Sequence, residues 1–377
     1  MAEVGILSMQ RIANYGSFLQ AYCLKQMLEE LGHGVQFVDY HIGTPLGMSQ
    51  KEAAAGWRRS VQKAAEVMAY DAPLYQRLEF LRFKKHFSKR YHPILGLTDT
   101  PNYTPKLDAL VIGSDEVFNC AQRNPNVGYS PELFGKDHRA RQLLTYAASF
   151  GNTTIQDLQQ YHKTQELSGL LKSFQSISVR DAHSGQLVHA LTGRETSFHL
   201  DPVLIYDLIG KCSQIPKIAP KEKYLLLYAY SGRISHQEAY WISDYARKHD
   251  LKIYTLGGIQ SCGNRFIPCD PFSVPAWFRS AELVLTDTFH GTIFSTITQR
   301  PFVTLIRKTR QGSYGNEEKL RDLLMRLNLA DRGTTEIEAA RTILKKPIDF
   351  AQTRRIIEQG RKSAYQYLKE QIREPRK

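Results

Sequence analysis

VGILSMQRIANYGSFLQAYCLKQMLEELGHGVQFVDY, residues 4–40, begins and ends with apolar runs and has a helical pattern between them. The runs at 4–7 and 35–40 have the length of β-strands. Residues 16–31 repeat apolar side chains every three or four positions, and Gly32 is placed to end a helix. Two strands joined through a helix usually lie parallel. The stretch therefore predicts a βαβ unit and a parallel sheet.

The same alternation of strands and helices continues along the chain. Further strands are predicted at 107–113, 143–149, 177–180, 197–202, 224–230, 251–256, 283–285 and 302–306. A segment with proline and polar residues, 208–223, separates two groups of strands. The predicted fold class is α/β, with two Rossmann-like doubly wound domains that face each other across a cleft. Ligands are expected at the carboxyl ends of the strands.

The expected domain boundaries follow from this rhythm. We predict an N-terminal Rossmann-like domain over residues 1–210, with a helical basic insertion over residues 42–92. A C-terminal Rossmann-like domain is predicted over 222–345, and a basic helix over 346–377.

Length and composition indicate a globular protein. The chain has 377 residues, of which 42% are hydrophobic and 11% aromatic, which suits two domains. Its first residues do not form a signal peptide, and no apolar run approaches the roughly eighteen residues of a membrane span. We therefore expect a cytoplasmic protein. Five cysteines are scattered without a C-x-x-C pair, which favours reduced packing residues over disulfides or a metal site.

The formal net charge of +13 suggests an anionic partner. Basic residues are enriched in two segments, 57–85 and 345–377. Four apolar residues of the second follow helical spacing and predict an amphipathic helix docked by one face: Ile357, Ala364, Leu368 and Ile372. Charged faces of this kind are usually only solvated. The alternative is peripheral contact with an anionic membrane at its inner face, and we expect no nucleic-acid partner.

TDTFHGT, residues 286–292, contains the first candidate for chemistry. It follows the apolar run 283–285 and precedes a helical pattern, so His290 is expected at a helix N-terminus. Such a terminus attracts anions, and an imidazole can act as general acid or base near neutral pH. The alternative is a histidine that only caps or packs the turn. The neighbouring Asp287, Thr288 and Gly291 favour a site.

Other predicted strands also end in polar loops. SMQRIANYGS, residues 8–17, follows the first strand, and GSDEVFN, residues 113–119, follows the strand that begins at Leu107. Arg180 and Asp181 end another. Each loop alone would suit an ordinary strand-to-helix connection. Together with the loop of His290 they indicate a binding site.

Several catalytic motifs are absent from the sequence. The chain has no G-x-x-x-x-G-K-[ST], G-x-G-x-x-G, H-E-x-x-H or G-x-S-x-G. This disfavours nucleotide hydrolysis, dinucleotide redox chemistry, zinc proteolysis and serine esterase chemistry. A D-x-D pair is also missing, which disfavours a glycosyltransferase that holds a nucleotide diphosphate through a metal in that motif.

Segments in a fixed order resemble the polysaccharide pyruvyl transferase family. They are GILSMQRIANYGSFLQAY (5–22), IGSDEVFN (112–119), YAASFG (146–151), SVRD (178–181), LDPVL (200–204) and TDTFHGTIFS (286–295), and YGNEEKLRDLL (314–324) fits as well. Single pieces are unspecific, whereas their order and spacing are specific.

The resemblance implies a fold similar to that of two-domain GT-B glycosyltransferases, with the acceptor on the N-terminal side and the donor on the C-terminal side. It implies transfer of a pyruvyl group from phosphoenolpyruvate, the donor substrate, to a sugar acceptor, giving a pyruvate ketal without a cofactor. His290 would be the general acid, Arg180 would face the donor, and Asp115 would orient or deprotonate an acceptor hydroxyl. We predict donor binding by Arg11, Arg180, Thr288, Phe289, His290 and Gly291, and acceptor binding by Asn14, Tyr15, Ser17, Asp115 and Asn119.

One position departs from the family pattern. Better-known members carry a basic residue two places before the histidine, where this chain has Thr288. One donor contact is therefore either missing or supplied from elsewhere, with Arg11, Arg233 and Arg307 as the candidates.

Two alternative functions stay open at this point. A GT-B-like glycosyltransferase that uses a nucleotide sugar would share the fold. A non-catalytic basic protein that binds glycan or membrane would explain the charge. A lipid-linked oligosaccharide as the acceptor would explain the basic segments, because the protein would then act at an anionic membrane surface.

Overall fold

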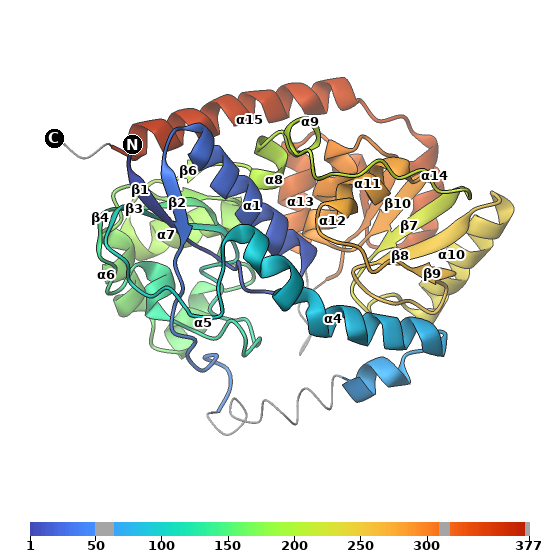
Figure 1. Cartoon of the computed structure of the whole chain (residues 1–377), viewed down its shortest axis with the longest axis horizontal. Coiled ribbons are helices and arrows are strands. Elements are labelled where there is room, and N and C mark those ends of the chain that lie inside the picture. The colour runs from blue at the N-terminus through green and yellow to red at the C-terminus, as the bar shows by residue number, and fades with distance from the viewer. Residues whose placement is uncertain (50–63, 309–316, 374–377) are drawn as a thin grey trace. The chain divides into compact units, whose positions relative to one another are not determined.

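The computed structural model describes residues 1–49, 64–308 and 317–373 (Figure 1). The basic residues 57–63 and the first part of the YGNEEKLRDLL segment, 314–316, lie outside these ranges. The chain forms two compact units. The described residues of the first unit are 1–49, 88–206 and 356–373, and those of the second are 64–87, 207–308 and 317–355.

The first unit is built on a six-stranded sheet in the order β2-β1-β3-β4-β5-β6, in which neighbouring strands are parallel. Its strands are β1 (Glu3–Leu7), β2 (Gly34–Phe37), β3 (Leu107–Asp115), β4 (Ala140–Ala148), β5 (Ser178–Val179) and β6 (Ser197–Phe198). Its helices are α1 (Tyr15–Glu30), η1 (Pro131–Phe134), α5 (Ile155–Gln160), α6 (Thr164–Lys172), α7 (Ala182–Thr192) and α8 (Pro202–Ile205). This strand order reverses direction between β1 and β3, which makes that position the topological switch point.

The second unit contains a six-stranded parallel sheet in the order β12-β11-β10-β7-β8-β9. Its strands are β7 (Tyr224–Tyr228), β8 (Lys252–Leu256), β9 (Arg265–Phe266), β10 (Leu283–Thr286), β11 (Phe302–Leu305) and β12 (Gly333–Thr334). Its helices include α9 (Leu208–Lys211), α10 (His236–Lys248), α11 (Ser273–Ser280), α12 (Phe289–Ile297), α13 (Glu317–Arg326), η2 (Ala330–Arg332), η3 (Ile337–Ala339) and α14 (Ala340–Lys345). Read from β9, this is the strand order of the Rossmann fold, with its switch point between β7 and β10.

Continuous apolar runs explain the central strands. Every residue of β7, β10 and β11 is buried. Parallel strands that are covered on both faces have this composition, because neither face meets water. In the first unit, Phe118 stacks on Phe134 with ring centroids 4.7 Å apart. Burial of one such side chain contributes about 1.5–3 kcal/mol.

Two long helices, α4 (Leu74–Leu95) and α15 (Phe350–Gln371), contribute residues to both units. In the C-terminal segment the apolar side chains of Ala364, Leu368 and Ile372 are buried. The Tyr367 hydroxyl donates a 2.9 Å hydrogen bond to the Thr145 carbonyl in the first unit. Over the ranges that the structure describes, no helix has the length and apolarity that crossing a membrane requires.

Candidate functional site

In the first unit, hydrogen bonds tie together the two loops at the switch point. The Ser8 hydroxyl, just after β1, donates to the Ser114 carbonyl near the end of β3, at 2.8 Å. The Gln20 amide of α1 donates to Ser8 Oγ at 2.9 Å, and its oxygen accepts from Ser114 Oγ at 2.8 Å. All three side chains are buried. Because each polar group is paired, the network fixes the loop after β1 against the end of β3.

Asp115 lies at the carboxyl end of β3 and is held by Ser17 of α1 and by a buried arginine. Its backbone has φ 80°, an uncommon conformation for a residue with a side chain. The Ser17 hydroxyl donates to Asp115 Oδ2 at 2.9 Å. Arg180 Nη1 is 3.5 Å from Asp115 Oδ1 and 3.3 Å from Asp201 Oδ2. The carboxylate is therefore oriented by a hydroxyl and a guanidinium, and it is partly exposed.

Arg180 itself is buried, with 3% of its side chain exposed, between two carboxylates. Burial lowers its pKa, but the Asp115 and Asp201 carboxylates outweigh this effect and raise the pKa above the usual value. The guanidinium therefore stays charged, and some of its N–H groups face the carboxylates of Asp115 and Asp201. Asp201 was not among the predicted site residues, although it lies near the end of the predicted strand 197–202, in LDPVL.

The other predicted residues of this unit have structural partners. The Asn14 side chain accepts from the Ser17 amide at 2.7 Å and caps α1, and Tyr15 is buried. Asn119 donates to Glu116 Oε2 at 2.8 Å. Arg11 forms a two-pronged ion pair with Asp39, at 2.5 and 2.7 Å. The hydrogen bond from Arg11 to Asp39 raises the arginine pKa.

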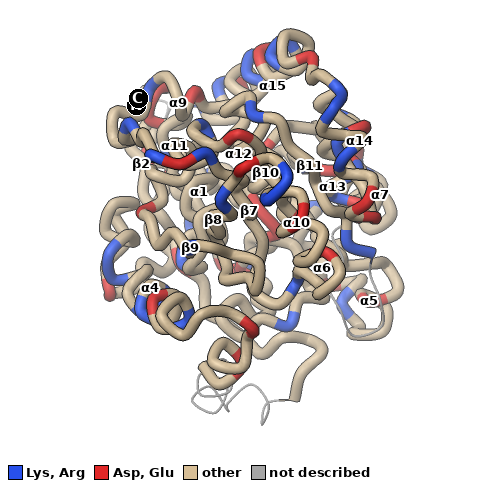
Figure 2. The backbone as a smooth tube through the Cα atoms, turned by 90° about the vertical axis from the view of Figure 1, so that its right-hand side faces the viewer, with Lys and Arg blue, Asp and Glu red and all other residues tan. Residues whose placement is uncertain are grey.

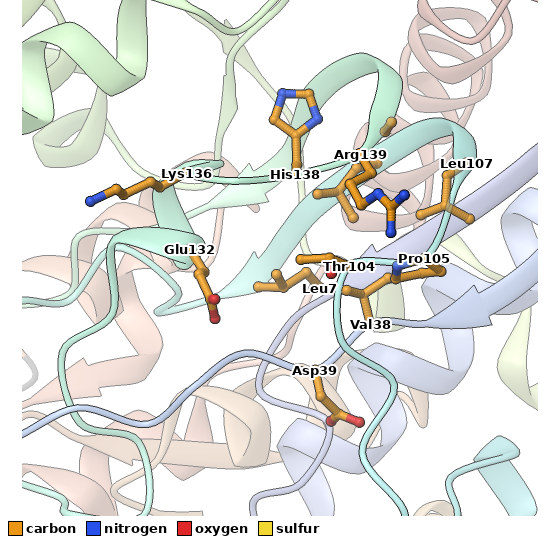
Figure 3. A pocket seen from close by; sticks show the side chains of 12 residues that line it. Leu7, Val38, Asp39, Thr104, Pro105, Leu107, Glu132, Lys136, His138 and Arg139 are labelled. Carbon is orange, nitrogen blue, oxygen red and sulfur yellow. The ribbon is translucent and has the colours of Figure 1, made fainter.

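A separate hollow of the first unit lies at a face of the sheet (Figure 3). Its lining includes Leu7 and Leu107 from the sheet and Glu132, Lys136 and His138 from the segment before β4. None of the predicted site residues lines it. Because it mixes acidic, basic and apolar side chains, it does not indicate one class of ligand.

In the second unit, His290 occupies the first turn of α12, directly after β10. The Thr288 hydroxyl accepts from the Gly291 amide at 2.9 Å and caps the helix. Thr286 Oγ1 donates to the Tyr228 carbonyl of β7 at 2.7 Å and is 3.1 Å from Thr288 Oγ1. These contacts fix the turn at the switch point between β7 and β10. His290 is therefore a partly exposed imidazole at the positive end of a helix.

Arginines from both neighbouring strands approach this turn. Arg233 follows β7, and its Nη1 is 3.8 Å from Asp287 Oδ2. Arg307 follows β11, and its Nε is 3.6 Å from the same oxygen. Asp287 is fully buried, so burial raises its pKa while the two arginines oppose that shift. The second switch point thus combines an imidazole, a helix N-terminus and two guanidinium groups.

Arg307 and Arg233 differ in how closely other groups of the protein hold their guanidinium groups. Arg307 forms a 2.5 Å ion pair with Glu238 in addition to its contact with Asp287. Arg233 stacks over the Tyr230 ring at 4.8 Å and keeps 31% of its side chain exposed. Thr288 and Phe289 are buried, and the Thr288 hydroxyl is used by the helix cap. Among the predicted donor-binding residues of this unit, His290 is partly exposed, whereas Thr288, Phe289 and Gly291 are buried.

Comparisons with known proteins agree with this architecture. A family model described as polysaccharide pyruvyl transferase matches residues 14–309. No curated protein matches the chain. The UDP-GlcNAc 2-epimerase from Methanocaldococcus jannaschii is similar in structure, with 11% sequence identity, a TM-score of 0.51, and coverage of 98% of this chain and 99% of the epimerase. The glycotransferase of kitacinnamycin is similar with 10% identity, a TM-score of 0.49, and coverage of 99% of each chain.

The likeness to the epimerase, at 11% identity and a TM-score of 0.51, shows the fold alone. The predicted fold class, two Rossmann-like doubly wound domains of the GT-B kind, is confirmed, while the cleft between them stays a prediction. The family model covers most of the chain, which confirms the resemblance found in the sequence. The chain belongs to the polysaccharide pyruvyl transferase family.

Proposed function

We propose that this protein is a transferase that moves a pyruvyl group from phosphoenolpyruvate to two hydroxyls of a sugar in a polysaccharide precursor. The observation that carries the proposal is the position of His290, at a helix N-terminus and in the same unit as Arg233 and Arg307. Phosphoenolpyruvate carries a carboxylate and a phosphate, and guanidinium groups and helix N-termini bind both. An imidazole at the same place can deliver a proton to the donor.

The reaction needs one proton donor and one proton acceptor. Protonation of the methylene carbon of phosphoenolpyruvate gives a methyl group and an oxocarbenium-like carbon. One sugar hydroxyl adds to that carbon, the C–O bond to phosphate breaks, and the second hydroxyl adds and closes the ketal ring. Two hydroxyl protons leave the sugar, so one replaces the proton used on the methylene carbon and the other accompanies the released phosphate. The atoms balance as one ketal and one inorganic phosphate, without an oxidant or a reductant.

The residues take separate roles in this scheme. His290 is the general acid for the donor. Asp115 orients or deprotonates the sugar hydroxyls, and Ser17 beside it binds the acceptor. The contacts of Arg180 support a positioning role, in which it holds the Asp115 carboxylate in place. Its direct contact with the donor, implied by the family, stays a prediction.

Arg233 is the best candidate for the cation that Thr288 does not supply. Arg307 is engaged by Glu238, and Arg11 is engaged by Asp39. Arg233 keeps more of its side chain exposed than Arg307 and lies at the switch point of the same unit as His290. We expect it to pair with the phosphate or carboxylate of the donor.

His290→Ala tests the proposed function. We expect phosphate release from phosphoenolpyruvate to fall by about 10²–10⁴-fold, because a positioned general acid contributes that much. His236→Ala is the matched control, since His236 also lies in the first turn of a helix of the second unit and is exposed. Acceptor-dependent phosphate release is measured for both variants over a panel of nucleotide-linked and lipid-linked hexoses. Equal rates for the two variants would contradict the role of His290.

A nucleotide-sugar glycosyltransferase is the second candidate, and the uncharged, capping Thr288 favours it. A thermal-shift assay separates the two. Stabilisation by a nucleoside diphosphate and none by phosphoenolpyruvate would favour the glycosyltransferase.

A further inference from the structure

Exposed apolar side chains gather on one segment of the second unit. Met68 is 37% exposed, and in the first turns of α4 Leu74 is 53%, Tyr75 is 59% and Leu78 is 53% exposed. Single exposed apolar side chains are ordinary on a soluble protein. Four of them within eleven residues form a patch, and such patches mark interaction sites.

The opposite side of α4 explains why this patch faces outward. Phe80 packs edge-on against Phe266 of β9, with ring centroids 5.4 Å apart. The Gln76 amide donates to the Gly263 carbonyl at 3.1 Å. These residues anchor the helix to the second sheet. Leu74, Leu78 and the side chains that follow at the same helical spacing are therefore directed away from the core.

Basic side chains continue this outer face. Arg82 lies four positions after Leu78, and Lys85 three positions after Arg82, so all three share one face of the helix. Both basic residues are exposed, and neither has an ion-pair partner within the described ranges. Figure 2 shows basic residues, in blue, along α4. Apart from Glu79, an exposed acidic residue beside Tyr75 and Arg82, the face is apolar over its first turns and cationic over the next ones.

The C-terminal helix α15 provides an internal comparison. It carries exposed basic residues such as Lys362 and Lys369. No exposed large hydrophobic side chain of the described chain lies in it. Its basic residues fit a solvated face, whereas the charges of α4 stand next to exposed leucines.

We propose that the outer face of residues 68–86, formed by Met68, Leu74, Tyr75, Leu78, Arg82 and Lys85, binds the surface of an anionic lipid bilayer. The leucines would enter the boundary between headgroups and acyl chains, and the two basic residues would contact lipid phosphates. This surface does not depend on the function proposed for His290.

A second copy of the chain is a poorer occupant for this face. In an antiparallel contact over the whole face, Leu74 and Leu78 of one copy would meet Arg82 and Lys85 of the other. In a parallel contact, like charges would meet. Neither arrangement places an anion beside the basic residues. An anionic bilayer would supply an apolar interior for the leucines and phosphate groups for the basic residues.

Co-sedimentation of the full-length protein with lipid vesicles tests the proposal. We expect binding at low salt to vesicles of phosphatidylglycerol and phosphatidylcholine, and none to phosphatidylcholine alone. Arg82→Gln with Lys85→Gln should weaken binding about five-fold for each charge removed. Leu74→Ser with Leu78→Ser should weaken it about ten-fold. The matched controls, Lys362→Gln with Lys369→Gln in α15 and Tyr240→Ser with Met325→Ser elsewhere, should leave binding unchanged.

Three results would overturn the proposal. The first is no binding of the unaltered protein to anionic vesicles at low salt. The second is a loss in the α15 charge control as large as the loss in α4, since that would indicate non-specific attraction. The third is self-association that the leucine variant abolishes, which would assign the face to a second copy. Because none of these assays contains phosphoenolpyruvate or a sugar, a failure of the proposed function would leave them unchanged.

Discussion

At the scale of single residues, Gly291 shows how tightly the turn of His290 is built. A Cβ atom at this position would overlap Thr286 Oγ1 and lie 2.7 Å from both Thr288 Oγ1 and Tyr228 Cδ1. Its neighbours are a helix cap and a buried ring of the adjacent strand, so neither can move freely. Glycine at 291 therefore lets α12 begin close to β7, which places His290 at the switch point.

Gly291→Ala should destabilise the protein by about 1–3 kcal/mol, because it overpacks this contact. Gly169→Ala is the matched control. Gly169 lies within α6, where an added Cβ meets no atom within 4 Å, so alanine should be neutral or stabilise by about 0.5–1 kcal/mol. Thermal unfolding of both variants measures the difference. Equal losses of stability would show that position 291 has more room than the structure gives it.

At the scale of elements, the N-cap of α12 links stability to the site. The Thr288 hydroxyl accepts from the Gly291 amide, so this side chain satisfies a helix end that also carries His290. Thr288→Ala should cost about 0.5–2 kcal/mol, whereas Thr288→Ser should keep most of the stability. Chemical denaturation of the two variants tests this expectation. A serine variant as unstable as the alanine variant would contradict a capping role.

The elements also show what the sequence could and could not predict. Short apolar runs of three or more residues predicted the positions of β1, β3, β7 and β10, because a parallel strand that is covered on both faces is apolar along most of its length. The predicted strand at 197–202 was too long, since β6 ends at Phe198 and Pro202 begins α8. The two-residue strands β9 and β12 were missed, because neither lies in an apolar run of strand length.

For the site, the sequence predicted loops but not the partners within them. His290 was expected at a helix start, and the structure places it there. The sequence could not show that the Thr288 hydroxyl is used by the cap or that Arg11 is held by Asp39. These pairings depend on which strands lie side by side. The composition of the strands does not predict their order in the sheet.

At the scale of the whole molecule, the first unit is completed by the end of the chain. Gln142 of β4 exchanges two hydrogen bonds with the backbone of residue 373, at 2.9 Å each. Leu368 is fully buried in the same unit. The first unit therefore joins segments from the beginning, the middle and the end of the sequence, and its stability should depend on α15.

Leu368→Ala should destabilise the protein by about 2–5 kcal/mol, because it removes buried methyl groups and leaves a cavity. Lys362→Ala, at an exposed position of the same helix, should change stability by less than about 0.5 kcal/mol. Denaturant unfolding followed by circular dichroism compares the two. If Leu368→Ala were as mild as Lys362→Ala, the docking of α15 on the first unit would be wrong.

The central claim is that the protein forms a ketal from phosphoenolpyruvate by protonating its methylene carbon. The most direct measurement is the reaction in D₂O with phosphoenolpyruvate and a sugar acceptor, with the product examined by NMR and mass spectrometry. We predict a ketal whose methyl group carries one deuteron, and one phosphate released for each ketal formed. A product that keeps the vinyl group, or transfer that releases a nucleoside diphosphate and leaves phosphoenolpyruvate unchanged, would contradict the claim.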